Sequence, residues 1–181
     1  MFRLFEAPTA DDVWQQIAEN FRQGRFSSGQ ASRVGVTSEI LHAGINISNP
    51  RQRWIPSRQP ALNIAFALAE MIWIMRGRND STFLNYFNSK LPKYAGHGPT
   101  YHGAYGHRLR SVFGFDQLLR AYSALKHNPD SRQVTLQIWN ASTDFPDDNG
   151  QPMASDIPCN ISCLLKVRKG RLEWLTSDAQ Q

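Results

Sequence analysis

The sequence is short of cysteine: its 181 residues contain only Cys159 and Cys163. Apolar and polar residues alternate around this pair, which predicts one extended strand. Two side chains four positions apart on a flat strand share a face but lie too far apart for an unstrained disulfide. We therefore expect reduced thiols and no disulfide framework.

Long hydrophobic runs are also absent. The longest apolar stretch, residues 64–75, includes Glu70 and is too short to span a bilayer. The first residues lack the basic segment followed by an apolar run that marks a secretory signal. These absences predict a protein that is soluble and cytoplasmic and that makes no contact with a membrane.

Metal-binding and nucleotide-loop patterns are absent too. His97, His102 and His107 recur every five residues, a spacing that suits neither one helical face nor a known zinc motif, so no metal is predicted. The glycine-rich segment 96–106 lacks the glycine-lysine-serine ending of a phosphate-binding P-loop.

The net charge of +5 fits an anionic substrate, a nucleic acid or a solubilising surface, and does not choose among them.

Helix and strand patterns run through most of the chain. Apolar residues recur at helical spacing after the capping residues Thr9 and Asp116 and after Pro60, and they alternate in later segments. We expect helices over 9–24, 60–77, 80–88 and 116–128, short strands within 26–44, and strands over 134–138, 161–167 and 172–176, the last two joined by a turn at 168–170.

The order of these elements predicts the architecture. The helix over 60–77 is expected to be largely buried, because it is apolar almost throughout, and residues 92–106 are expected to form a loop. Neither an internal repeat nor a low-complexity linker occurs. We therefore expect a single domain, 1–181, of the α+β class, with a mixed β-sheet packed by helices.

Four islands of sequence carry a resemblance to a known family. In chain order they are Ala69-Glu70-Met71-Ile72-Trp73 with Gly77, then Tyr105-Gly106-His107-Arg108-Leu109-Arg110, then Asp130-Ser131-Arg132 with Trp139-Asn140, and then Pro158-Cys159-Asn160. Their order and spacing resemble thymidylate synthase over most of the chain from about Arg33 onward. The resemblance implies the α+β fold of that family and a homodimer.

The chemistry of that family explains why one activated cysteine is needed. Carbon 5 of uracil is a poor nucleophile, and a thiolate added at carbon 6 turns it into an enolate that attacks a one-carbon electrophile. The resemblance implies that Cys159 is this nucleophile. It also implies that the protein is a thymidylate synthase, which methylates dUMP to dTMP with 5,10-methylenetetrahydrofolate as one-carbon donor and reductant.

Two alternatives to thymidylate synthase stay open. One is a deoxypyrimidine-nucleotide hydroxymethylase, in which water rather than hydride ends the reaction. The other is a non-catalytic module for dimerisation or nucleic-acid binding. Nucleic acid is the less favoured partner, because the arginines are scattered and no aromatic-basic repeat occurs.

Two arginines are expected to bind the substrate phosphate. Arg132 is similar to the family arginine that reaches phosphate across the dimer interface, and a guanidinium pairs with phosphate through two hydrogen bonds. A cation near Cys159 also raises the fraction of reactive thiolate. Arg33 lies in a segment similar to the family's early phosphate-binding loop. The family has a second arginine directly after the first, where this chain has Gln133.

Glu70 and Tyr105 complete the predicted catalytic set with Cys159. A carboxylate on an apolar helix face must be paired or have a raised pKa, and in the family this glutamate organises water and protons near the pyrimidine. The alternative is a structural salt bridge. Tyr105 is expected to line the pocket as a hydrogen-bonding phenol, and the alternative is a core tyrosine. Cys163 is expected to be structural, and Asn160 stands where many family members have histidine.

Segments that the family carries after its nucleophile are not found in this sequence. They include an Arg-Ser-Asp-type phosphate-binding segment, an asparagine that reads the pyrimidine edge, and a histidine and a tyrosine that hold the sugar. We therefore expect that the C-terminal part of the domain is missing. Without the asparagine, the choice between uracil and cytosine stays open.

Overall fold

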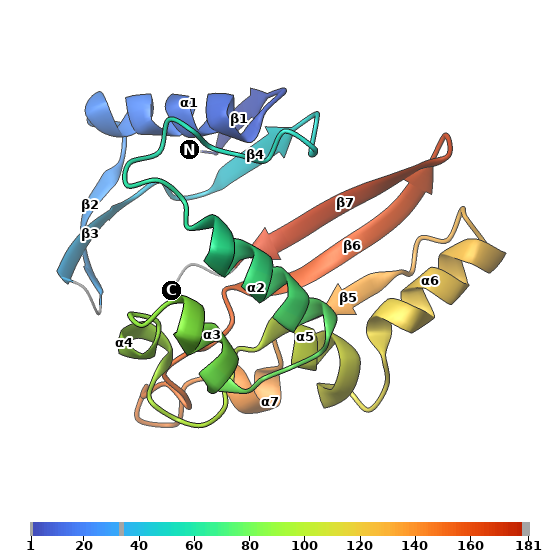
Figure 1. Ribbon diagram of the computed structural model, residues 1–181. Coiled ribbons are helices and arrows are strands. Elements are labelled where there is room, and N and C mark those ends of the chain that lie inside the picture. The colour runs from blue at the N-terminus through green and yellow to red at the C-terminus, as the bar shows by residue number, and fades with distance from the viewer. Residues whose placement is uncertain (1, 33–34, 179–181) are drawn as a thin grey trace. The chain divides into compact units, whose positions relative to one another are not determined.

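The computed structural model describes residues 2–32 and 35–178 (Figure 1). By its internal contacts the chain forms two compact units, 1–63 and 64–181. Each unit has its own apolar core. The prediction of a single domain stays a prediction, and the two units are described separately below.

The first unit combines one helix with two small sheets. Strand β1 (Arg3–Ala7) pairs in parallel with β4 (Ala43–Ile47), and β2 (Ser27–Ser32) pairs antiparallel with β3 (Gly35–Glu39). Helix α1 (Ala10–Arg22) begins where the Thr9 hydroxyl accepts a hydrogen bond from the Asp12 amide at 3.1 Å. Its Val13 packs with Phe5 in a core at the first sheet. The predicted helix and short strands are confirmed, whereas β1 was not predicted.

The second unit contains the remaining helices. They are α2 (Ile64–Met75), α3 (Ser81–Phe87), α4 (Pro92–Ala95), α5 (Tyr105–His107) with the π-helical turn η1 (Arg108–Val112), α6 (Gln117–His127) and α7 (Ala141–Asp144). The carboxylates of Asp80 and Asp116 cap α3 and α6. The cap at Asp116 and the helix after Asp80 were predicted, whereas the cap at Asp80 was not. The loop predicted over 92–106 includes α4 and the start of α5, so the prediction was only partly right.

Two predictions for α2 were wrong. The helix begins at Ile64 rather than at Pro60, and the Pro60 carbonyl accepts a hydrogen bond from the Arg58 guanidinium at 2.6 Å. The helix is also mostly exposed, with only Ala69 and Trp73 buried. Its large exposed side chains are all apolar: Ile64, Leu68, Met71, Ile72 and Met75. A helix that is apolar on every side gives no sequence signal for the face that it buries.

A three-stranded antiparallel sheet forms the other side of the second unit. Its order is β5 (Thr135–Gln137), β6 (Asn160–Arg168) and β7 (Arg171–Asp178), so all three predicted strands are confirmed. Gly170, with φ of 70°, lies in the turn that joins β6 to β7. Leu136 of β5 lies opposite Cys163 of β6, and both are buried beneath α6.

A second core joins α2 to the segment that precedes α5. Trp73, Leu84, Tyr101 and Ala104 are its buried members. Gly106 of α5 lies so close to α2 that a Cβ atom on it would be 2.1 Å from the Ile74 carbonyl oxygen. Only glycine allows this approach. The close packing places Tyr105 next to the helix that carries Glu70.

No helix among the described residues is long and apolar enough to cross a membrane. The cytoplasmic location stays a prediction.

Candidate active site

A pocket of about 210 Å³ lies within the second unit, between α2, the α3–α4 region, residues 101–105 and residues 156–158. Its walls are largely apolar and include Trp73, Leu84, Leu91 and Pro158. Its ionisable lining residues are two carboxylic acids and two phenols: Glu70, Asp156, Tyr101 and Tyr105. A pocket of mostly apolar lining with a few convergent polar groups is typical of a small-molecule site.

Glu70 lies in the middle of α2, directly after the buried Ala69, and lines the pocket. Burial raises the pKa of its carboxyl group above the ordinary value of 4.5. Among the described residues of its own unit, Glu70 has no ion pair that would offset this desolvation. A carboxyl with a raised pKa is suited to holding a proton, and the structural salt bridge stays an alternative.

Tyr105 and Cys159 are neighbours. Burial raises the pKa of the Tyr105 phenol, the negative charge of a Cys159 thiolate adds to the effect, and the nearby backbone amides of Asn160 and Cys159 oppose it. Cys159 is exposed and directly follows the buried Pro158, just before β6 begins. The structure thus brings the predicted catalytic residues together: Glu70 and Tyr105 line one pocket, and Tyr105 adjoins Cys159.

Cys163 differs from Cys159 in its surroundings. It is 3% exposed within the core between β6 and α6, and burial raises the pKa of its thiol. A thiol in such a place is a small apolar core residue rather than a nucleophile.

The two predicted phosphate ligands are not part of this pocket. Arg132 is exposed in the segment between α6 and β5, and the described lining of the pocket does not include it. Arg33 lies outside the described residues. The roles of both arginines stay predictions.

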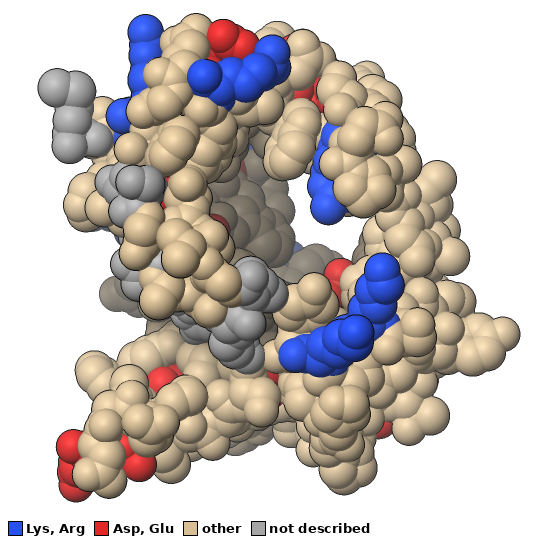
Figure 2. Space-filling model, turned by 90° about the vertical axis from the view of Figure 1, so that its left-hand side faces the viewer, with Lys and Arg blue, Asp and Glu red and all other residues tan. Residues whose placement is uncertain are grey.

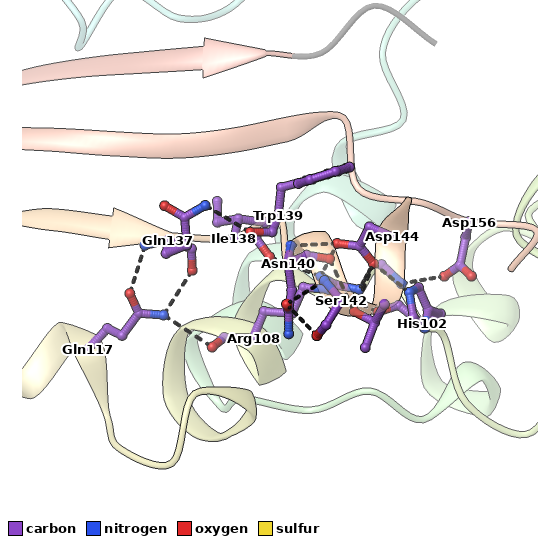
Figure 3. A network of polar contacts seen from close by, with 12 residues as sticks. His102, Arg108, Gln117, Gln137, Ile138, Trp139, Asn140, Ser142, Asp144 and Asp156 are labelled. Atoms are coloured by element: carbon purple, nitrogen blue, oxygen red, sulfur yellow. Dashed lines mark hydrogen bonds and ion pairs between the residues drawn. The ribbon is translucent and has the colours of Figure 1, made fainter. Parts of the chain in front are cut away.

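Sequence reasoning missed a buried ionic network that ends near the pocket (Figure 3). Arg108 is 2% exposed and donates two hydrogen bonds to the Asp144 carboxylate, at 2.7 and 2.8 Å, and a third to the Ile138 carbonyl at 2.9 Å. His102 Nε2 lies 2.7 Å from Asp144 Oδ1, and the Asn140 amide donates to Oδ2 at 2.7 Å.

These contacts fix the charge of Asp144. Burial alone would raise the pKa of its carboxyl, but the hydrogen bonds from Arg108, Asn140 and His102 outweigh burial and hold the pKa at about 2. The network joins α7, the end of β5, η1 and the segment before α5. It therefore positions residues 101–105, which form one wall of the pocket. Arg108 and Asn140 belong to sequence islands noted above, but no spacing rule links them to Asp144.

Asp156 is the second carboxylate of the pocket and was not singled out from the sequence. Its Oδ2 accepts a hydrogen bond from the Gly103 amide at 2.9 Å (Figure 3). A Cβ atom on Gly103 would lie 2.2 Å from the Asp156 carbonyl oxygen, so this contact requires glycine. Burial raises the pKa of Asp156, and the Gly103 and His102 amides and the His102 side chain lower it by less.

The described residues include no group of three or more histidine, cysteine, aspartate or glutamate side chains that could hold a metal ion. The absence of a metal stays a prediction.

Comparison with known sequences identifies the family. The sequence model of the thymidylate synthase family matches residues 49–178. Because this match covers most of the chain, the protein belongs to the thymidylate synthase family, and both the resemblance and the α+β fold class predicted from it are confirmed.

The relatives fall into two kinds. A deoxyuridylate hydroxymethyltransferase of Pseudomonas phage M6 is 34% identical over 130 residues, which cover 71% of this chain and 36% of that protein. The protein of the same name from Bacillus phage SP01 is 30% identical over 84% of this chain and 40% of its own length. A protein of Methanothermobacter marburgensis, provisionally named a thymidylate synthase, is 41% identical over 77% of this chain and 57% of its own length. The chain thus spans between about a third and three fifths of the length of these relatives.

Proposed function

We propose that the site at Cys159 transfers a one-carbon unit from 5,10-methylenetetrahydrofolate to carbon 5 of deoxyuridylate. The observation that carries the proposal is the exposed Cys159 thiol beside Tyr105, which shares a pocket with Glu70, in a chain of the thymidylate synthase family. Methylation to dTMP and hydroxymethylation share these steps, and relatives of both names match the chain.

The side chains present fit the first half of the reaction. The Cys159 thiolate forms a bond to carbon 6 of the base, and the ring electrons move toward the oxygen on carbon 4. The Glu70 carboxyl, whose pKa is raised by burial, is suited to give a proton to that oxygen. Carbon 5 then attacks the methylene carbon of the donor and loses its own proton. The Tyr105 phenol lies close enough to Cys159 to help orient the base.

The walls of the pocket also fit the donor. Folates carry a flat ring system, and the apolar side chains of Trp73, Leu84 and Leu91 offer contact surface to such a ring.

Phosphate binding is assigned to Arg132 and Arg33. Arg132 is exposed and lies outside the lining of its own pocket, so we propose that it serves the pocket of a second copy in a homodimer. A guanidinium is suited to the two negative charges of a nucleotide monophosphate.

The nucleic-acid alternative receives no support from the charge distribution seen in Figure 2. On the face drawn there, the Lys and Arg side chains at the top lie next to Asp and Glu side chains. Proteins that bind single strands combine a continuous basic groove with stacked aromatic side chains.

The direct test is covalent trapping. The chain is mixed with 5-fluorodeoxyuridylate and 5,10-methylenetetrahydrofolate, and its intact mass is measured. Fluorine at carbon 5 does not leave as a proton does, so a working site accumulates an adduct of protein, nucleotide and donor.

Two cysteine variants locate the adduct. We expect no adduct with Cys159→Ser and a normal adduct with Cys163→Ala, provided that both variants keep the wild-type circular dichroism spectrum. A folded wild-type chain without an adduct would refute the proposed function.

A further inference from the structure

The steps above use only one of the two carboxylates in the pocket. Asp156 lies three residues before the nucleophile and lines the same cavity as Glu70 and Tyr105. Its position is fixed, because the Gly103 amide donates to Oδ2 and the two backbones touch at Gly103. The carboxylate is therefore held at the wall of the cavity rather than free to turn into solvent.

The charges around Asp156 suit it to accept a proton. The ionisable groups near it include His102, whose charge favours the ionised carboxylate, and Tyr101, whose pKa the Asp156 charge helps to raise. His102 also lies against Asp144, which is itself paired with Arg108. Desolvation is the largest influence and raises the pKa of Asp156. A carboxylate with a raised pKa is a stronger base than an exposed one.

The presence of this group bears on how the reaction ends. Once the donor has left, the base carries an exocyclic methylene carbon on carbon 5 that accepts either a hydride or a water molecule. Hydride transfer is favoured where water is excluded. A half-buried carboxylate such as that of Asp156 instead holds water by hydrogen bonds and accepts its proton.

We propose that Asp156 positions and deprotonates a water molecule that ends the reaction, so that the product is a 5-hydroxymethyl pyrimidine nucleotide. This inference rests on the proposed function of Cys159.

The step balances without an oxidant or a reductant. The water oxygen forms a bond to the methylene carbon, the carbon–carbon π electrons move to the oxygen on carbon 4, and one water proton passes to Asp156. The enolate then restores the double bond between carbons 5 and 6, and the bond to Cys159 breaks with its electron pair on sulfur. Tetrahydrofolate leaves unoxidised.

The test separates methylene transfer from its ending. The wild-type chain and the Asp156→Asn variant are incubated with deoxyuridylate and 5,10-methylenetetrahydrofolate in water enriched in heavy oxygen, and the nucleotides are analysed by mass spectrometry. The fluoro-nucleotide adduct is measured in parallel. Asparagine keeps the size and the acceptor for the Gly103 amide but cannot take the proton. Asp148→Asn, at an exposed aspartate, is the matched control for charge.

We expect the wild-type chain and Asp148→Asn to form a hydroxymethyl product that carries the heavy oxygen. Asp156→Asn should form the adduct normally and release this product about 100-fold more slowly. A normal rate of release, a loss of the adduct in Asp156→Asn, or a methylated product from a wild-type chain that forms the adduct would each overturn the inference and leave the proposed function standing. A wild-type chain that forms no adduct would overturn both.

Discussion

Asp144 is a carboxylate whose side chain is 0% exposed and which receives hydrogen bonds from Arg108, Asn140 and His102. Its folded-state pKa of about 2 lies below its ordinary value of 3.8. A carboxylate whose pKa is lowered by folding stabilises the fold at pH values above its unfolded-state pKa. This stabilisation is lost as the pH falls through its folded-state pKa. The difference corresponds to about 2 kcal/mol.

This arrangement predicts a specific acid sensitivity. Asp144→Asn should lower the free energy of unfolding at neutral pH by about 3 kcal/mol or more, because Arg108 is left buried without a counter-charge. The loss should shrink between about pH 4 and about pH 2, where the wild-type carboxylate becomes protonated. Urea unfolding followed over this range, with Asp148→Asn as control, measures both effects. An equal loss at every pH would contradict the assignment.

Ionisation of the Glu70 carboxyl is predicted to lower the stability of the fold, and the residue is predicted to support activity. Its pKa is raised above 4.5, so its ionisation costs folding free energy as the pH rises through that value and costs nothing well below it. Glu70→Gln should therefore raise the melting temperature at neutral pH, with no gain below about pH 4. The same variant should form the fluoro-nucleotide adduct about 100-fold more slowly.

The higher melting temperature and the slower adduct formation are separate expectations for Glu70→Gln. The first follows from the burial of the carboxyl alone, whereas the second follows only if Glu70 acts in the reaction. A variant that is stabilised and still forms the adduct at the wild-type rate would leave Glu70 without a catalytic part. Calorimetry and mass spectrometry on the same preparation decide this.

Between elements, the contact of α5 with α2 determines one wall of the pocket. Gly106→Ala would place a Cβ atom 2.1 Å from the Ile74 carbonyl oxygen, where a backbone group cannot yield easily. We expect a loss of about 3 kcal/mol in unfolding free energy and a smaller amount of the fluoro-nucleotide adduct. Gly98→Ala, whose Cβ would meet its nearest atom at 3.5 Å, should change stability by less than about 0.5 kcal/mol. Equal effects in urea unfolding would show that this contact is not required.

Local elements could largely be predicted from the sequence. Thr9, Asp80 and Asp116 mark helix starts by a hydrogen bond within three residues, and the alternation over 161–167 predicts β6 from its neighbours alone. The short strand β1 was missed because its partner β4 lies about forty residues away.

Prediction of the candidate site from the sequence is limited in the same way, by contacts between residues that are distant in the chain. Cys159, Glu70 and Tyr105 were named from motifs, and the structure gathers them at one place. Asp144 and Asp156 were not named from motifs, because their partners His102, Gly103 and Arg108 are 36 to 53 residues away in the sequence. Single aspartates in polar segments look alike until the fold pairs them.

At the scale of the whole molecule, the position of Arg132 bears on how many copies of the chain one complete site requires. Arg132 is exposed and absent from the described lining of the pocket that adjoins Cys159. If Arg132 serves the site of a second copy, each site takes its nucleophile from one chain and its phosphate ligand from the other. A symmetric dimer then contains two identical shared sites.

Mixing two inactive variants tests this arrangement. Cys159→Ser lacks the nucleophile, and Arg132→Ala should lack phosphate affinity, so neither alone should form the fluoro-nucleotide adduct at low nucleotide concentration. After denaturation and refolding together, half of the dimers should be mixed, and one of the two sites in each should combine an intact Cys159 with an intact Arg132. Adduct on about a quarter of all sites is therefore expected, on the Arg132→Ala chain alone. If Arg132 acted within its own chain, every site in the mixture would carry one of the two defects. A mixture without adduct would therefore argue against sharing, and adduct on Arg132→Ala by itself would remove Arg132 from the site.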